Sequence, residues 1–296
     1  MVRGKPEATR LAVTALLAGG HLLVEDVPGV GKTLLAKALA RGVGGTFARI
    51  QATPDLLPAE LTGTNVFRPG DGTWQFRPGP LFANVVVVDE VNRATPRTQS
   101  ALLEAMEERQ VTVDGETRAL PDPFLVVATQ NPFEHAGTFP LLEGQRDRFA
   151  VVVHIGHPDR RAAQELLLGS GGVDALEKMG TVTTPAGLAG AIAAVRQVHC
   201  SPAVADYVID LAGASREHPA VVTGASPRAS LSLLDVAKAR AAIDGRRFVL
   251  PDDVKAVAVP ALAHRLVLSG GPDMAAGAAA VRAVLGTVPV PPTPTR

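Results

Sequence analysis

Cysteine is almost absent from this sequence, and its scarcity excludes a class of architecture. The 296 residues include a single cysteine, Cys200, so no intrachain disulfide can form and the chain is not a disulfide scaffold. A reducing compartment, the cytoplasm, is therefore the expected location. Aromatic residues are also scarce, at 4% of the chain, whereas 46% of the residues are hydrophobic. That hydrophobic share is enough for a sizeable core without cofactors or disulfides.

An excess of charge of either sign is lacking as well. The chain has 29 basic and 29 acidic residues, which gives a formal net charge of zero. Dedicated nucleic-acid binders usually show a basic excess or stripe, so this balance argues against that class. No apolar run approaches the roughly 18 residues of a membrane span, and the N-terminal run is interrupted by Glu, Thr and Gly, unlike a secretory signal.

Short apolar runs rich in β-branched residues alternate with helical patterns up to about residue 157. Continuous runs of this kind indicate strands that are buried on both faces of a parallel sheet. The five runs are 21–25, 47–52, 84–90, 124–131 and 149–155. Helices are expected at Thr33–Arg41 and at Pro96–Arg109, the second with Thr95 as its N-cap. The sequence therefore predicts a doubly wound α/β domain over 1–157, with a mainly parallel five-stranded sheet.

Two β-hairpin inserts are expected within this domain, each at an Asp-Gly turn. The first covers 111–120 around Asp114-Gly115, where two short extended runs flank the turn. The second covers 65–81, where Trp74 and Phe76 alternate behind the turn, and its prolines restrict it to edge pairing.

From about residue 159 the strand patterns stop and helical patterns take over. Helices are expected near 186–199, 202–216, 227–244 and 252–266. This predicts an all-α lid domain over 158–284. The last residues, 285–296, are rich in proline and are expected to form a tail.

The segment EDVPGVGKT, residues 25–33, almost matches the phosphate-loop signature G-x-x-x-x-G-K-[ST]. Asp26 stands where the first glycine is expected. The N–H groups that cradle a phosphate come mainly from Gly29 to Thr33, at the start of a helix, so we expect the loop to bind phosphate despite Asp26. Lys32 would place a positive charge at the β and γ phosphates, and Thr33 would ligate Mg²⁺.

Polar residues end two of the predicted strands, at the sheet edge where open α/β sheets bind ligands. Asp89 and Glu90 follow the run VVVV, so the aspartate can hold Mg²⁺ through its water shell and the glutamate can polarise an attacking water. Asn131 ends the next strand and can orient that water without adding charge.

Two arginines lie farther along the chain. Arg228 falls in the first turn of a helix that Ser226 caps, where a cation opposes the helix macrodipole unless an anion such as a phosphate offsets it. Arg148 lies just before the last strand and is a candidate for the positive group that one subunit donates to the site of its neighbour. Arg146 is a rival for that role.

With these elements in order, the chain resembles the MoxR family of AAA+ ATPases. The resemblance covers nearly the whole chain and is carried by runs such as LLVEDVPGVGKT, GPLFANVVVVDEVNRA and ATQNPFEHAGTFPLLEGQRDRF. It implies the P-loop (ASCE/AAA+) fold, ATP/ADP and Mg²⁺ as cofactors, and the following motifs: Walker A at Asp26–Thr33, Walker B at Asp89 and Glu90, sensor 1 at Asn131, an arginine finger at Arg148 and sensor 2 at Arg228. The implied nucleotide-binding residues are Asp26, Val27, Pro28, Gly29, Val30, Gly31, Lys32, Thr33, Leu34 and Arg228. Thr33 and Asp89 would be at the metal, and Lys32, Glu90, Asn131 and Arg148 would be catalytic.

The resemblance also implies a homo-oligomeric, hexameric ring that hydrolyses ATP at its subunit interfaces to remodel or activate a protein client. Von Willebrand A-domain partners and metal-cofactor maturation are among the roles of the family, and the two hairpins match its inserts. Gly144 and Arg146 depart from the family pattern, which more often has a small and an apolar residue there. Two alternatives stay open: an AAA+ motor acting on nucleic acid, and a P-loop kinase.

Overall fold

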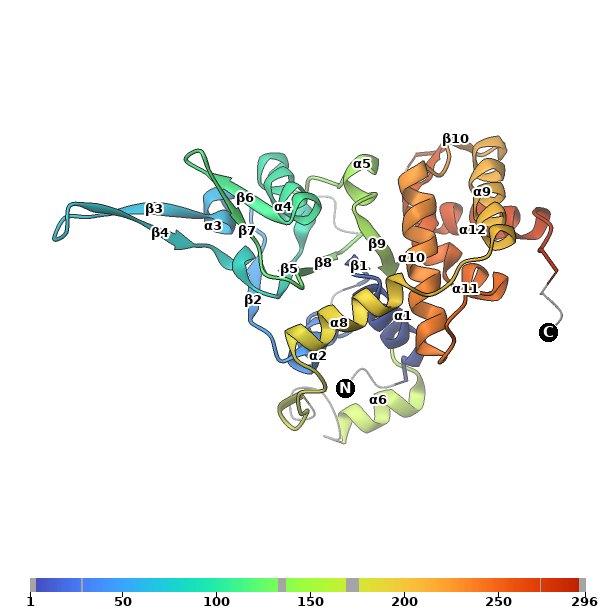
Figure 1. The fold of residues 1–296 in the computed structure, drawn as a ribbon, viewed down its shortest axis with the longest axis horizontal. Coiled ribbons are helices and arrows are strands. Elements are labelled where there is room, and N and C mark those ends of the chain that lie inside the picture. Colours follow the sequence, from blue (N-terminus) through green and yellow to red (C-terminus); the bar gives the residue numbers. More distant parts are fainter. Residues whose placement is uncertain (1–3, 28, 133–136, 169–175, 272, 293–296) are drawn as a thin grey trace. The chain divides into compact units, whose positions relative to one another are not determined.

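The computed structural model describes residues 4–27, 29–132, 137–168, 176–271 and 273–292 (Figure 1). Contacts within the chain divide it into two compact units. The first unit consists of Met1–Thr9, His21–Pro140 and His154–Ala189, and the second of Arg10–Gly20, Leu141–Val153 and Gly190–Arg296. The domains predicted from the sequence, 1–157, 158–284 and 285–296, were defined by helix and strand patterns. The two units are defined by contacts between residues and are therefore a different kind of division.

A five-stranded sheet has the order β2-β5-β8-β1-β9. Its strands are β1 (His21–Glu25), β2 (Phe47–Gln51), β5 (Val85–Asp89), β8 (Leu125–Gln130) and β9 (Phe149–Val153). The pairs β2–β5, β5–β8 and β8–β1 are parallel. The predicted α/β fold with a parallel sheet is therefore confirmed. Each of the five observed strands lies within one of the five apolar runs from which it was predicted.

Four of the five strands are buried along all or nearly all of their length. Every residue of β1, β5 and β9 is buried, as is all of β8 except Gln130. Strand β2 is the exception, because only Ile50 is buried and Phe47 is 40% exposed. The expectation that 47–52 is buried on both faces was wrong, because four of the five residues of β2 are not buried, although β9, at the other edge of the sheet, is buried throughout.

Four helices and two 3₁₀ turns are described within the first unit. They are α2 (Lys32–Val43), α3 (Pro58–Thr62), α4 (Pro96–Glu108) and α6 (Arg160–Leu167), with 3₁₀ turns η1 (Pro80–Phe82) and η2 (Val91–Arg93). Helix α2 packs against β5 and β8. Thr95 caps α4, as predicted, because its Oγ1 accepts from the N–H of Thr98 at 3.4 Å. Two more helices, α1 (Pro6–Leu17) and α8 (Pro185–Arg196), have residues in both units.

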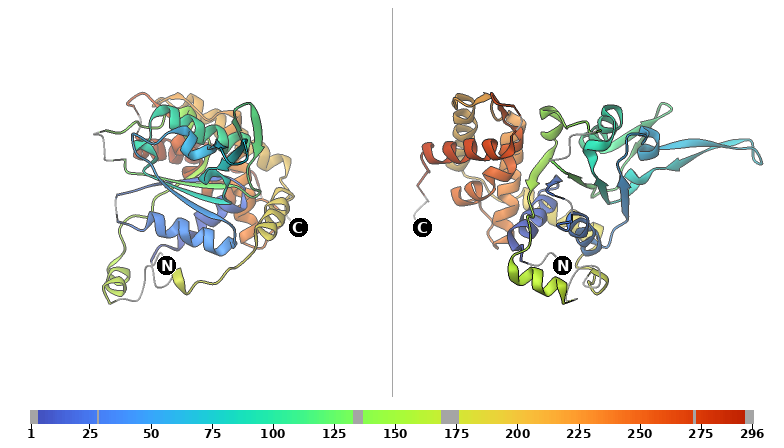
Figure 2. Two further views of the ribbon diagram at one scale, coloured as in Figure 1. Left: turned by 90° about the vertical axis from the view of Figure 1, so that its left-hand side faces the viewer. Right: turned by 180° about the vertical axis from the view of Figure 1, so that it is seen from behind.

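Both predicted hairpins are present in the first unit. They pair β3 (Gly63–Arg68) with β4 (Thr73–Pro78) and β6 (Gln110–Val113) with β7 (Glu116–Ala119), in each case antiparallel. Asp114 and Gly115 have φ angles of 52° and 82°, the left-handed values that a tight hairpin turn requires. The β3–β4 hairpin projects from the body of this unit (Figures 1 and 2).

The aromatic residues of the β3–β4 hairpin have different environments. The ring of Phe76 contacts the ring of Phe82, with centroids 5.6 Å apart, and the guanidinium of Arg118 lies 4.1 Å above it. Trp74 is 70% exposed and touches only the ring of Phe67 among the aromatic residues described, at 5.3 Å. Phe76 therefore packs at the base of the hairpin, whereas most of the Trp74 side chain is exposed.

Helices dominate the second unit. Besides β9 and the short helix α5 (Glu143–Arg146), they are α9 (Pro202–Glu217), α10 (Pro227–Ile243), α11 (Pro251–Leu262), the 3₁₀ turn η3 (Ala263–Arg265) and α12 (Met274–Thr287). The predicted cap Ser226 accepts a backbone N–H bond from Ala229 at 3.1 Å, and Ser201 caps α9 in the same way, accepting from Val204 at 3.4 Å. Among the residues that the structure describes, none of the helices has both the length and the apolar character needed to cross a bilayer.

Two features of this unit correct the sequence analysis. Strands do not stop at residue 159, because β10 (Val221–Thr223) pairs antiparallel with β11 (Val267–Leu268). Strands of two and three residues are too short for an alternating pattern to be visible. Helix α12 was also missed, because its many Ala and Gly residues give little apolar periodicity, and it continues past residue 284.

A buried histidine joins three elements of the first unit. His21 Nδ1 accepts from the N–H of Val126 at 3.0 Å, so the proton of the neutral ring is on Nε2, which donates to the carbonyl of Met106 at 3.0 Å. Burial is the main cause that lowers the pKa of His21 to about 4. Protonation would turn Nδ1 into a donor facing another donor, so the folded state holds this ring neutral.

The stability of the first unit should consequently fall in mild acid. The unfolded chain binds a proton at His21 below its ordinary pKa of 6.5, whereas the folded chain does so only near pH 4. His21 alone should therefore remove about 2 kcal/mol of unfolding free energy between pH 7 and pH 5, measured by urea unfolding. His21→Gln should flatten this fall, and the exposed His157→Gln should leave it unchanged. An equal slope in His21→Gln would contradict the assignment.

Candidate functional site

The predicted phosphate loop lies between β1 and α2, at the carboxyl end of the sheet. Gly29 and Gly31 have φ angles of 83° and 96°, and a Cβ atom at either position would meet nothing within 4 Å. Glycine is needed there for its backbone angles and not for space. Helix α2 begins at Lys32 without a side-chain cap, so the N–H groups of its first turn, which includes Leu34, are available to an anion. Pro28 lies outside the described residues.

Lys32 holds the ends of two strands together. Its Nζ donates to the carbonyl oxygens of Asp26, at 2.5 Å, and of Gln130, at 3.1 Å. Burial lowers the pKa of Lys32, and the charges of Asp26, Glu90, Asp89 and Glu25 oppose that shift. The ammonium group is therefore half-buried among carboxylates, where an arriving phosphate would offer it oxygens of full charge in place of carbonyls.

The carboxylate of Asp26, the residue that departs from the loop signature, is fully engaged in the first unit. Its Oδ1 accepts from the N–H of Val27 at 2.9 Å, and its Oδ2 accepts from the N–H groups of Ile155 and Gly156 at 2.8 and 2.5 Å. Three amide dipoles thus offset its negative charge. Asp26 anchors the start of the loop to the turn that follows β9, a role that a glycine could not perform.

The predicted metal residues touch each other. Thr33 Oγ1 donates to Asp89 Oδ1 at 3.0 Å, and Thr129 Oγ1 donates to the same oxygen at 3.3 Å. Arg49 Nε donates to Asp89 Oδ2 at 2.7 Å, which neutralises the buried carboxylate. A hydroxyl and a carboxylate side by side form an oxygen-only donor set, which suits Mg²⁺. Thr33 and Asp89 are the residues that would hold it.

Glu90 adopts a left-handed conformation, with φ 57° and ψ 48°, which is uncommon outside glycine. Its N–H donates to Thr129 Oγ1 at 3.1 Å. Its Oε2 accepts from Gln51 Nε2 and pairs with Arg93 Nε, both at 3.1 Å. The carboxylate therefore lies one residue past Asp89 in a defined position, and Oε2 is the oxygen that receives both of these donors.

Asn131 directly follows Gln130, whose carbonyl binds Lys32, so it lies at the same strand end as the loop contact. The structure thus brings the loop, Asp89, Glu90 and the β8 end together in the first unit. Arg148 and Arg228 belong to the second unit. Arg148 lies between α5 and β9, and Arg228 is in the first turn of α10 behind its cap Ser226.

Comparison with known families assigns both parts of the chain. A model of the ATPase family associated with various cellular activities (AAA) matches residues 21–151, and a model of the AAA lid domain matches residues 213–284. Chaperone MoxR1 of Mycobacterium tuberculosis is 42% identical over 278 residues, which cover 91% of this chain and 73% of that protein. Protein MoxR of Methylorubrum extorquens is 32% identical over 325 residues, covering 98% and 92%.

The chain belongs to the MoxR family of AAA+ ATPases.

The crystal structure of a candidate ATPase from Cytophaga hutchinsonii agrees with this assignment. It superposes with a TM-score of 0.85 at 35% identity, covering 96% of this chain and 89% of that one. The agreement over both units of this MoxR-family chain confirms the predicted α/β fold with a helical lid.

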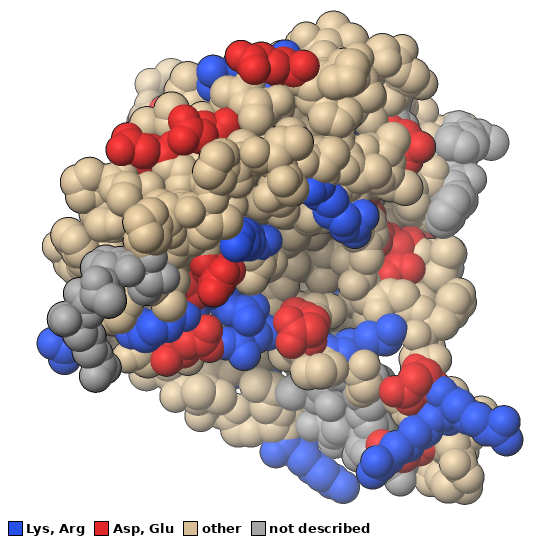
Figure 3. Space-filling model, turned by 90° about the vertical axis from the view of Figure 1, so that its right-hand side faces the viewer, with Lys and Arg blue, Asp and Glu red and all other residues tan. Residues whose placement is uncertain are grey.

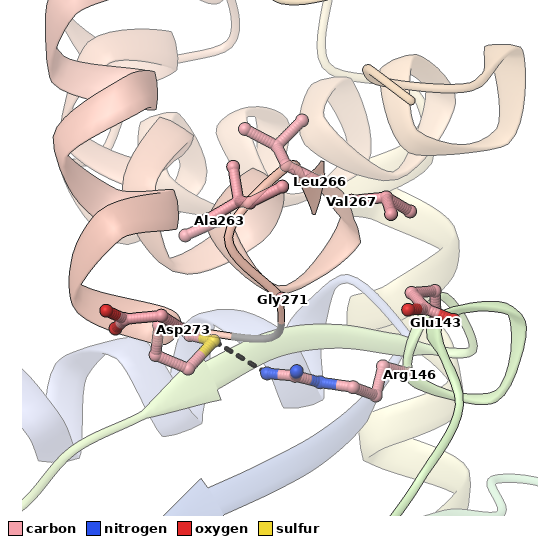
Figure 4. Close-up of a pocket in the computed structure, with 9 residues that line it drawn as sticks. Glu143, Arg146, Ala263, Leu266, Val267, Gly271 and Asp273 are labelled. Carbon is pink, nitrogen blue, oxygen red and sulfur yellow. Dashed lines mark hydrogen bonds between the residues drawn. The ribbon is translucent and has the colours of Figure 1, made fainter. Parts of the chain in front are cut away.

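The two rival arginines of this MoxR chain differ in their surroundings. Arg146 points into a small pocket of the second unit, where its guanidinium contacts the sulfur of Met274 and where Glu143 and Asp273 are also found (Figure 4). Its charge contributes to lowering the pKa of the buried His264. These contacts engage Arg146 within its own unit.

Four residues around the carboxylates were not found from the sequence. Arg49 and Gln51 contact Asp89 and Glu90 from β2, and Thr129 and Arg93 do so from β8 and η2. A partial signal was available for the first two, because polar residues two apart on a strand share a face. The register that places Gln51 opposite Asp89 is visible only in the structure. For Thr129 and Arg93 the sequence offers no comparable pattern.

The hydrogen bonds of Asp26 predict whether its substitution strengthens or weakens the binding of nucleotide. If Asp26 repelled the phosphates, Asp26→Ala would tighten the binding of nucleotide. Because it anchors the loop through three N–H bonds, we expect Asp26→Ala to weaken binding about fivefold or more by calorimetry, and to lower the unfolding free energy by about 1–3 kcal/mol. Asp71→Ala, an exposed acid at the hairpin turn, is the control. Tighter binding by Asp26→Ala would overturn the anchor.

Proposed function

We propose that this MoxR-family chain hydrolyses ATP at the interfaces of a homo-oligomeric ring and uses the cycle to remodel a protein client. The observation that carries the proposal is the contact of Thr33 with Asp89 beside Lys32, with Glu90 next in the chain. This set contains each group that phosphoryl transfer to water needs on the protein side: a cation, metal ligands and a carboxylate.

Each residue has a distinct task in this proposal. The N–H groups of Gly29–Thr33 and the ammonium of Lys32 bind the terminal phosphates, and Thr33 and Asp89 hold Mg²⁺. The metal, when bound, neutralises charge on the phosphate oxygens. Glu90 orients and polarises the attacking water while Gln51 and Arg93 hold its Oε2, and Asn131 fixes the position of that water.

The two arginines of the second unit would act on charge that develops during transfer. Arg228 lies at the N-terminus of α10, where its charge and the helix dipole both favour an anion such as a phosphate. Arg148 would be supplied to the site of the adjacent subunit, as arginine fingers are. A hexamer and a client with a von Willebrand A domain are our proposals from the family, and Trp74 is the candidate client contact.

A nucleic-acid motor is the second candidate, and charge argues against it. The net charge is zero. On the face drawn in Figure 3, basic and acidic side chains are interspersed among the residues described and do not separate by sign. Stimulation of ATP turnover by DNA or RNA would favour this candidate over a protein client.

Mixing two inactive variants tests catalysis at interfaces. Arg148→Ala and Glu90→Gln should each reduce kcat on the order of 10³-fold. In a 1:1 mixture, an Arg148→Ala subunit retains Glu90 and can receive Arg148 from a Glu90→Gln neighbour. About one quarter of the interfaces in a head-to-tail ring are then complete, and steady-state turnover should recover to about that level.

The matched control mixes Lys32→Ala with Glu90→Gln. Both changes damage the loop-bearing side of the same site, so no interface becomes complete and turnover should stay at the level of the single variants. Equal turnover in the two mixtures would reject a site shared between subunits and favour a kinase-like, self-contained site.

A further inference from the structure

A buried arginine donates hydrogen bonds to the backbone on both sides of Arg148. Arg265, in η3, has a side chain only 3% exposed. Its Nη2 donates to the carbonyl of Asp147 at 3.1 Å and to the carbonyl of Phe149 at 2.9 Å. Its Nε lies 2.7 Å from Asp147 Oδ1 in an ion pair. The residues before and after Arg148 are thus both fixed by a single guanidinium.

The other contacts of Arg265 lie on lid helices. Nη2 also donates to Ser232 Oγ on α10 at 3.0 Å, and Nη1 donates to the carbonyl of Ala261 on α11 at 2.6 Å. Ser232 is one turn after Arg228 on the same helix, and the charge of Arg228 contributes to lowering the pKa of Arg265. Arg265 therefore ties the Arg148 segment to the helix that carries the predicted sensor 2.

The neighbouring His264 strengthens this attachment. Its Nε2 donates to the carbonyl of Phe149 at 3.0 Å, the acceptor that Arg265 also uses. Burial, followed by the charge of Arg265, holds the pKa of His264 well below its ordinary value, so the ring is neutral. Phe149 is thus fixed by two donors from one 3₁₀ turn.

Stability alone does not explain a charge at this position. Burial lowers the pKa of Arg265 to about 10, with Asp147 opposing the shift, so the group is still charged at neutral pH. A buried ion pair is often no more stabilising than apolar side chains of the same volume. What the guanidinium supplies, and an apolar residue would not, is directional bonding to several fixed acceptors.

We infer that Arg265 is a positioning residue for Arg148. It would hold the backbone of Arg148 where the side chain can reach the neighbouring subunit, and it would make this position depend on the lid helices. The inference rests on the proposed interface role of Arg148. It agrees with the division of the chain, in which Leu141–Val153 belongs to the unit that contains α10, α11 and η3. The lid of one subunit would then determine the position of the Arg148 side chain at the site of its neighbour.

Arg265→Lys is the first test, because lysine keeps a positive charge but has a single nitrogen, which cannot bond the acceptors of Nε, Nη1 and Nη2 at the same time. Misplacing a catalytic group by about 1 Å can cost on the order of 100-fold, so we expect kcat of the Arg265→Lys protein to fall at least about tenfold. The Kd for ATP should change less than about threefold, because the loop lies outside the altered contacts.

Mixing assays separate positioning from general damage. Arg265→Lys subunits retain Lys32 and Glu90, so Glu90→Gln subunits, which have a well-placed Arg148, should restore their turnover. Arg148→Ala subunits should restore nothing, because Arg265→Lys subunits can offer only a misplaced finger. General damage to the lid would instead prevent rescue by either partner.

Arg246→Lys is the matched control. Arg246 makes a two-bond pair with the buried Asp253, at 2.5 and 2.6 Å, in the same unit and without contact to 147–149. Its substitution should lower the melting temperature and leave kcat within about twofold of the original chain. A loss of kcat as large as that of Arg265→Lys would show that any broken lid ion pair suffices, and would overturn the inference.

Ser232→Ala serves if Arg265→Lys does not fold, since it removes one hydrogen bond only. We expect a loss of kcat of about two- to fivefold with the same rescue pattern. Unchanged kcat in Ser232→Ala, or rescue of Arg148→Ala but not of Arg265→Lys by Glu90→Gln, would overturn the role of Arg265 alone. Failure to rescue Arg148→Ala itself would reject the shared site on which the inference rests.

Discussion

Parallel hydrogen bonding of β8 between β5 and β1 is the constraint on which the candidate site depends. Parallel strands end at the same edge, so the loop after β1, the acids after β5 and Asn131 after β8 meet there although they are far apart in sequence. The apolar residues of these strands fix the register, because a shift would expose them to water. The chemistry of the edge is therefore held in place by burial elsewhere in the strands.

Electrostatic crowding is the difficulty that this edge creates. Asp26, Asp89 and Glu90 lie around one ammonium, yet each carboxylate already has donors: backbone N–H groups for Asp26, Thr33 and Arg49 for Asp89, and Gln51 and Arg93 for Glu90. A triphosphate would thus meet carboxylates whose charge is largely compensated. The donors also differ in kind, because backbone amides are fixed whereas side chains of Arg49 and Arg93 can move away. Backbone groups thus hold the acid that anchors the loop, whereas side chains hold the two acids that we propose act on metal and water.

The sequence predicts the parts of this arrangement that local physics decides. Strand runs, the caps Thr95 and Ser226, the Asp114-Gly115 turn and the loop glycines each follow from burial, capping or backbone angles within a few residues. Contacts such as Gln51 with Glu90 depend on which strands are neighbours, and the sequence does not state that order. Helix α12 and the β10–β11 pair escaped because small residues and very short strands carry no periodic signal. Asp26 departs from the phosphate-loop signature, and the sequence does not show why. Two of its partners, the N–H groups of Ile155 and Gly156, lie about 130 residues later in the chain.

Arg146 and Arg148 are two residues apart and lie in different surroundings. Arg146 ends the four-residue helix α5, and its side chain enters the pocket beside Met274 (Figure 4). Two residues later the chain is about to enter β9, and the carbonyls on either side of Arg148 are held by Arg265. The backbone on both sides of Arg148 is therefore fixed from within the same unit. A flexible segment would have to be ordered each time an interface formed, at a cost of about 1–2 kcal/mol for each backbone residue. Holding 147–149 against the lid in advance removes that cost, which is why a buried charge is physically reasonable at residue 265.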